Sequence, residues 1–230
     1  MTGFIRLDGL DLMVYNEMAF AVEGYAGRIM GFPTAIEHGE ALFEAALAEF
    51  IDKGYEQASI NTILSAAGMS KGQFYYHFAR KEDLYLALIG DLIQKKQDFL
   101  AAIMRPEDFQ QDIFSLFETQ MRYGMNFARE YPAINQFAES FLREKGSPIY
   151  EKALATYNFE DNAAIDGLIE AAYRRGEFRD DLPLPFIRKV IGYLFTHAAD
   201  VAGLNQADEF EEEMTYLIEF IRSGLASGKG

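Results

Sequence analysis

The chain has 230 residues, of which 50% are hydrophobic, 14% aromatic and 25% charged, and six are prolines. This composition is typical of a globular protein with a substantial core, and it excludes a disordered or fibrous chain. The formal net charge of −15 excludes a global positive field, so any contact with nucleic acid must come from a local patch.

The sequence contains no cysteine, which excludes disulfides, thiolate metal sites and cysteine nucleophiles. No apolar run approaches the roughly 18 residues that a membrane span requires. Asp8 and Asp11 interrupt the apolar stretch that a signal peptide needs at the N-terminus. We therefore expect a cytoplasmic protein with no membrane association.

Residues 1–35 form an N-terminal extension with two open interpretations. Leu10, Val14 and Met18 are spaced like one face of a helix, which favours an additional amphipathic helix. Alternatively, the segment is a leader that the natural protein lacks, because Met30 can itself serve as a start. Both interpretations stay open for residues 1–29.

The first strong helical pattern runs from Leu42 to Ile51. Its apolar residues follow the rhythm of one buried helix face. They are Leu42, Phe43, Ala46, Leu47, Phe50 and Ile51. Lys53 and Gly54 then supply a basic last turn and a residue able to adopt the left-handed conformation that ends a helix.

The rest of the chain also has a helical period. Leu84, Leu88 and Leu92 lie four residues apart, and a helix is predicted from about Phe186 to Gly203. Three prolines each follow a helical stretch and are expected to open the next element. They are Pro106, Pro132 and Pro148. The sequence therefore predicts an all-α protein, with an N-terminal three-helix domain over residues 36–96 and a C-terminal helical bundle over residues 97–230.

The segment from Ser59 to Lys81 predicts a helix-turn-helix. Ser59 and Ser70 are each placed to cap a short helix, and Gly68 is placed to make the turn between the two helices. Phe74 and Phe78, four residues apart, are expected to point inward. The second helix has a length suited to the major groove of DNA.

The outward side of this second helix suits a nucleic-acid surface. Lysine neutralises phosphate, tyrosine and histidine donate to phosphate oxygens, and glutamine reads a base edge. No acidic residue occurs from residue 57 to residue 81, although 36 of the 230 residues are acidic. Lys71, Arg80 and Lys81 lie inside this window, which predicts operator binding that weakens steeply with salt.

Residues 59–84, with the helix 42–51 before them, resemble the DNA-binding domain of the tetracycline-repressor (TetR) family. The resemblance lies in the runs AAGMSKG at 66–72, FYYHF at 74–78 and KEDL at 81–84. The chain departs from the family at Asn61, where many members carry arginine. The resemblance implies a dimeric repressor that binds a palindromic DNA operator and is released by a small-molecule effector.

The resemblance also implies roles for individual residues. Ser59 and Asn61 begin the supporting helix, Tyr75 and His77 take positions of phosphate-binding side chains, and Lys81 opens the helix that follows the recognition helix. Together with the outward side of the recognition helix, these positions give the predicted DNA-binding residues. They are Ser59, Asn61, Ser70, Lys71, Gly72, Gln73, Tyr75, Tyr76, His77 and Lys81.

The C-terminal helices have two interpretations. The apolar stripes over residues 186–203 and 210–225 indicate core helices, and in the TetR family the last two helices also form the homodimer interface. The aromatic-rich stretch from Phe109 to Phe141, together with Tyr173, either lines an effector cavity or fills an ordinary core. The effector and its contact residues are not predicted.

No catalytic constellation is found. The three histidines, His38, His77 and His197, are far apart and lack the spacing of metal ligands. We therefore predict no enzyme activity, no metal site and no cofactor. The alternative to a DNA-binding regulator is a helical small-molecule-binding protein that no longer binds DNA, which the net charge of −15 favours.

Overall fold

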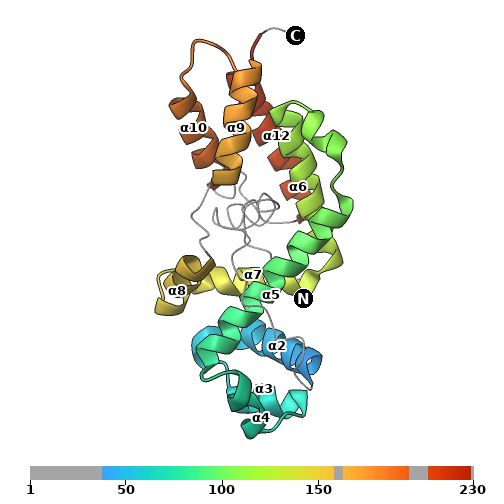
Figure 1. Cartoon of the computed structure of the whole chain (residues 1–230), viewed down its shortest axis with the longest axis vertical. Helices are drawn as coiled ribbons and strands as arrows, with labels where there is room; N and C mark the ends of the chain where they lie inside the picture. The colour runs from blue at the N-terminus through green and yellow to red at the C-terminus, as the bar shows by residue number, and fades with distance from the viewer. Residues whose placement is uncertain (1–37, 158–162, 197–206, 229–230) are drawn as a thin grey trace. The chain divides into compact units, whose positions relative to one another are not determined.

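The computed structural model describes residues 38–157, 163–196 and 207–228, which form ten α-helices and one 3-10 helix (Figure 1). The elements in chain order are α2 (Gly39–Gln57), α3 (Ile60–Ala67), α4 (Lys71–His77), α5 (Lys81–Ile103), η1 (Pro106–Gln110), α6 (Ile113–Glu130), α7 (Pro132–Arg143), α8 (Pro148–Tyr157), α9 (Ala163–Arg175), α10 (Leu184–Thr196) and α12 (Ala207–Leu225). The predicted all-α class is confirmed. The extension 1–35 and His197 lie outside the described residues.

Packing divides the described chain into two compact units. The first, here called the head unit, contains residues 38–98 and 131–157, so it combines α2, α3, α4 and most of α5 with α7 and α8. The second, here called the bundle unit, contains residues 99–130, 163–196 and 207–228. Packing thus groups α7 and α8 with the N-terminal helices. The domain boundary predicted at residue 96 stays a prediction.

One apolar face of α2 forms the core of the head unit. Leu42, Ala46 and Phe50 have no exposed surface, as the helical spacing predicted. Gly54 then adopts a positive φ of 70° and interrupts the helix before its last residues. Gly54 thus has a positive φ, but its ψ of 175° differs from the left-handed helical conformation that the sequence predicted, and the chain makes one more short turn to Gln57 after it.

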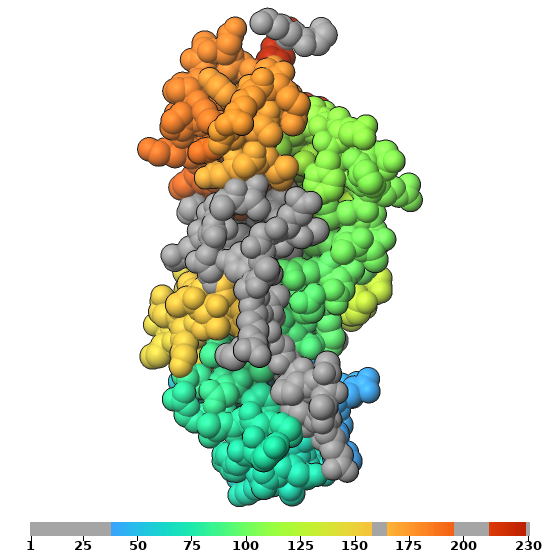
Figure 2. Space-filling view, in the orientation of Figure 1, coloured from blue at the N-terminus to red at the C-terminus, as the bar shows by residue number. Residues whose placement is uncertain are grey.

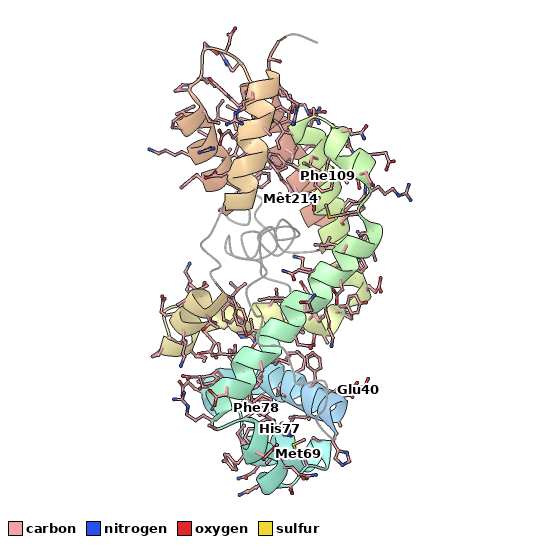
Figure 3. The ribbon with its side chains drawn as sticks, viewed as in Figure 1. Glu40, Met69, His77, Phe78, Phe109 and Met214 are labelled. Carbon is pink, nitrogen blue, oxygen red and sulfur yellow. The ribbon has the colours of Figure 1, made fainter. Side chains whose placement is uncertain are left out.

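The bundle unit has an aromatic and aliphatic core built from α6, α9, α10 and α12. The Phe117 ring packs edge-on against Phe195 with centroids 5.0 Å apart, and Phe114 packs against Phe178 at 5.5 Å. Met214 marks the place where α12 packs on α6 (Figure 3). Phe114 and Phe117, which lie in the stretch 109–141, are therefore core residues, as one of the two interpretations stated, whereas Phe109 is exposed.

The prolines act as the sequence predicted. The first residues of η1, α7 and α8 are Pro106, Pro132 and Pro148. A backbone N–H at the first position of a helix has no acceptor within the helix, so proline, which lacks this N–H, costs no hydrogen bond there. None of the helices in the described parts of the chain has the length and apolar character that a membrane span requires.

Candidate nucleic-acid interface

Two local signals build the turn between α3 and α4. The Ser59 hydroxyl accepts a hydrogen bond from the Thr62 amide at 3.4 Å and caps α3. Gly68 ends α3 with a φ of 65°, a conformation that disfavours side chains. The Met69 amide then donates to the Leu64 carbonyl at 3.0 Å. The sequence therefore stops α3 and redirects the chain into α4 within three residues.

A buried apolar wedge holds α4 against its neighbours. Phe74 is fully buried, and its ring stacks on Phe78 with centroids 5.5 Å apart. Met69 at the turn is 6% exposed, and it lies with Phe78 beside the two short helices (Figure 3). The inward orientation predicted for Phe74 and Phe78 is confirmed, so the opposite side of α4 faces outward.

The start of α4 is fixed by a capping box. The Gln73 amide donates to the Ser70 hydroxyl at 3.2 Å, and the Ser70 amide donates to the Gln73 side-chain oxygen at 2.9 Å. Gln73, which is predicted to read a base edge, therefore also stabilises the helix. The spacing of serine and glutamine three residues apart is a signal for this box that the sequence already contains.

The outer side of α4 presents polar and aromatic groups to solvent. Tyr76 is 84% exposed and Tyr75 is 56% exposed. Lys71, Gly72 and His77 are also exposed, and the His77 ring lies edge-on to Tyr76 at 4.9 Å. In the space-filling view, α3 and α4 form part of the teal surface of the head unit (Figure 2). The structure thus brings five predicted residues together on one helix side.

The supporting helix α3 adds a second polar edge. Asn61 is exposed on its first turn, and Ser59 before it is half-buried. The Ser59 amide donates to the Glu49 carboxylate on α2 at 2.9 Å. The position of the predicted α3 contacts is therefore fixed by α2, whose acidic side chain is used inside the head unit.

Lys81 has a different environment from the other predicted contacts. Its ammonium donates to three backbone carbonyls at the end of α2, those of Tyr55 at 2.6 Å, Glu56 at 2.9 Å and Ala58 at 3.2 Å. The same ammonium lies 4.7 Å from the Tyr55 ring centroid. A lysine ammonium has three N–H donors, so these carbonyls match its full donor capacity.

The helix α7 supports the same end of α2 from a distant part of the chain. The Ser140 hydroxyl donates to the Phe50 carbonyl at 2.9 Å, and the Glu144 carboxylate accepts from the Tyr55 amide at 2.7 Å. These contacts were not predicted from the sequence. They join residues about 90 positions apart, and no local spacing signals such a pair.

The helix α8 supports the start of α5. Lys152 forms a hydrogen-bonded ion pair with Glu82, and this bond holds the pKa of the Glu82 carboxyl below its usual value. The Tyr157 hydroxyl donates to the Leu86 carbonyl one turn further along α5. Burial raises the pKa of that hydroxyl to about 12.

Across the part of the chain that the structure describes, no three acidic or histidine side chains gather as metal ligands do.

A capped helix-turn-helix with an uncovered, acid-free recognition helix defines the class of a DNA-binding protein. Residues 42–88 match the family described as bacterial regulatory proteins, tetR family. Residues 42–88 therefore belong to this family, which consists of transcriptional regulators and not of enzymes.

Two transcriptional regulators are among the relatives that match in sequence. Residues of this chain are 41% identical over 63 residues to the transcriptional regulator AcuR of Cereibacter sphaeroides, a match that spans 27% of this chain and 29% of AcuR. They are 28% identical over 156 residues to the transcriptional repressor BepR of Brucella suis, over 64% of this chain and 71% of BepR. The match to AcuR thus spans less than a third of that protein.

A solved structure extends the likeness to the fold beyond the head. The crystal structure of a TetR family transcriptional regulator from Chloroflexus aurantiacus superposes with a TM-score of 0.61, over 82% of this chain and 93% of that one. At 23% identity this likeness shows the fold. The predicted combination of a helix-turn-helix domain with a C-terminal helical bundle is confirmed.

Proposed function

We propose that this TetR-family regulator is a homodimeric repressor that binds a palindromic DNA operator and is released by a small-molecule effector. One observation carries the proposal: α4 buries Phe74 and exposes Lys71, Tyr75 and Tyr76 on its opposite side. Each of these exposed groups donates to phosphate or base edges. Two such helices would enter major grooves about 34–36 Å apart. A DNA target also implies a cytoplasmic location.

The homodimer is supported by exposed aromatic side chains in the bundle unit. The helices α10 and α12 each bury one face in the core but leave large rings on the surface. These are Phe186 and Tyr193 on α10, and Tyr216 and Phe220 on α12. Phe220 is 69% exposed and Tyr193 is 62% exposed. Dimerisation through these helices would bury the aromatic rings, which are exposed to solvent in the isolated chain.

Repression, as opposed to activation, is supported by the similarity to BepR, which is a transcriptional repressor. An effector acts in this account by binding the bundle unit and favouring a state in which the two recognition helices fit the operator less well. Gln120 on α6 is the candidate effector contact. It is 3% exposed, and its side-chain oxygen has no hydrogen-bond partner among the described residues.

The competing function is a ligand-binding helical protein that no longer binds DNA, which the net charge of −15 favours. Selection of bound duplexes from a random library separates the two functions, because only a DNA-binding protein enriches one sequence. The variants Lys71→Ala and Tyr75→Ala should weaken binding of the selected duplex while the circular dichroism spectrum stays unchanged. The exposed Lys145, at the end of α7, gives a matched control in Lys145→Ala, which should bind like the wild type. Unchanged affinity in both test variants would contradict the proposed interface.

A further inference from the structure

The positive charge available to DNA at the head is smaller than the sequence implies. Within residues 57–81 the basic side chains are Lys71, Arg80 and Lys81. If all three neutralised phosphates on both half-sites, the logarithm of affinity would fall with the logarithm of salt concentration at a slope of about −5.4. The contacts of each side chain show how many of them are available.

Lys81 is already used inside the head unit. Its three carbonyl partners terminate α2, where backbone acceptors lack helical donors and where the helix dipole favours a cation. A phosphate that took this ammonium would leave those carbonyls without a donor. The contact therefore holds the first residue of α5 against the last turn of α2. The helices α3 and α4 lie between these two points in the chain.

Arg80 is balanced by two carboxylates. Its guanidinium lies 3.2 Å from a Glu82 oxygen and 3.7 Å from an Asp83 oxygen. Lys152 pairs with the same Glu82 carboxylate, so the cluster contains two acids and two bases and carries no net charge. Exposed pairs of this kind are weak, but a phosphate beside Arg80 would also approach both carboxylates. The cluster therefore offers no net positive charge to the operator.

Lys71 differs from both. It is exposed on the first turn of α4, and no ion pair joins it to an acid among the described residues. The neighbouring exposed groups on α4, Tyr75 and Tyr76, are uncharged donors. An uncharged donor binds phosphate or base edges but releases no counterion, so it adds affinity without adding salt dependence.

We propose that Lys71 is the phosphate-neutralising side chain of residues 57–81 and that Lys81 is a positioning residue, with uncharged donors such as Tyr75 and Tyr76 making the remaining contacts. The inference rests on the proposed operator-binding dimer. It predicts a slope of about −1.8 from two copies of Lys71, so affinity falls about 12-fold between 50 and 200 mM salt rather than about 1,800-fold.

The test measures operator affinity by fluorescence anisotropy at several salt concentrations, with the full chain and a duplex selected from a random library. The variants are Lys71→Gln and Lys81→Gln, with Lys145→Gln as the control. Lys71→Gln should remove more than half of the wild-type slope and leave the melting temperature unchanged. Lys81→Gln should keep the wild-type slope, even where affinity falls, and should lower the melting temperature. Lys145→Gln should match the wild type in both measurements.

Two results would overturn the inference while leaving the proposed function intact. One is a slope that becomes shallower by about 1.8 in Lys81→Gln, as a phosphate contact in both protomers requires. The other is a Lys71→Gln slope that retains half or more of the wild-type value. If Lys81→Gln does not fold, the inference is tested by Lys71→Gln alone, and it fails if that variant retains half or more of the wild-type slope. If the wild-type protein selects no duplex, the proposed function fails and the inference fails with it.

Discussion

The Glu144 carboxylate accepts a hydrogen bond from the Tyr55 backbone amide at 2.7 Å, directly after the glycine that interrupts α2. This bond connects α7 to the residues that lead into the helix-turn-helix. Replacing Glu144 with alanine leaves the amide without its acceptor, at a cost of about 1–3 kcal/mol in the free energy of unfolding. Urea denaturation measures the loss. Glu151→Ala, an exposed acid on α8, should change stability by less than about 0.5 kcal/mol.

Gly54 tests the same bond from the other side. Its φ of 70° and ψ of 175° lie in a region that is essentially restricted to glycine, and an added Cβ would lie 2.9 Å from the Glu144 carboxylate. Gly54→Ala should therefore cost more in the wild type than in the Glu144→Ala background, by about 0.5 kcal/mol or more. Strictly additive effects of the two substitutions would show that the carboxylate does not occupy this position.

Ser70 separates helix capping from DNA contact. Ser70→Ala removes the α4 cap and should cost about 1 kcal/mol of stability. Ser70→Asp keeps a capping oxygen, so stability should stay within about 0.5 kcal/mol of the wild type, but its charge repels phosphate and operator affinity should fall. The control is Ser147→Asp, because Ser147 caps α8 through the Tyr150 amide at 3.3 Å. Wild-type affinity in Ser70→Asp would remove Ser70 from the interface.

Replacing the buried Gln120 with methionine should make the protein more stable. Its unpartnered oxygen lies in the interior of the bundle unit, and its side-chain nitrogen reaches only the Met104 sulfur, at 3.8 Å, within the described residues. Gln120→Met keeps the side-chain length and should raise the free energy of unfolding by about 1–3 kcal/mol. The exposed Gln136 on α7 gives the matched control, Gln136→Met. A destabilised Gln120→Met would show that the folded protein satisfies this oxygen.

Lys96 on α5 should make stability depend on pH. It is 2% exposed, and burial lowers its pKa from 10.5 to about 7. Between these pH values the Lys96 amine is protonated in the unfolded chain but not in the folded chain. The free energy of unfolding therefore rises with pH from about 7 to about 10.5. Lys96→Met should therefore gain most over the wild type near pH 6, and its advantage should shrink by pH 10. An advantage that does not vary with pH would mean that the lysine titrates normally.

Local signals predicted the head well. The caps at Ser59 and Ser70, the left-handed Gly68 and the buried pair Phe74 and Phe78 each depend on residues within four positions of one another. Such short-range hydrogen bonds and helical spacings leave a readable pattern in the sequence. The fold class and the outward side of α4 followed from them.

Long-range contacts were not predictable in the same way. The sequence placed Lys81 among the DNA contacts because of its charge and position, and only the structure shows its ammonium on the carbonyls of α2. The bond from Glu144 to Tyr55 spans 89 positions. Tertiary packing creates these pairs, and a single sequence carries no periodic signal for them.

In the proposed function, α4 reads the major groove of a palindromic operator. Methylation interference on a duplex selected from a random library tests it directly, because methylated guanine N7 blocks the major groove. We predict two symmetric clusters of interfering guanines, with centres about 10–10.5 base pairs apart or a multiple of that spacing. The interference should be lost when the selected half-sites are scrambled. A selected duplex on which major-groove methylation has no effect would contradict the claim.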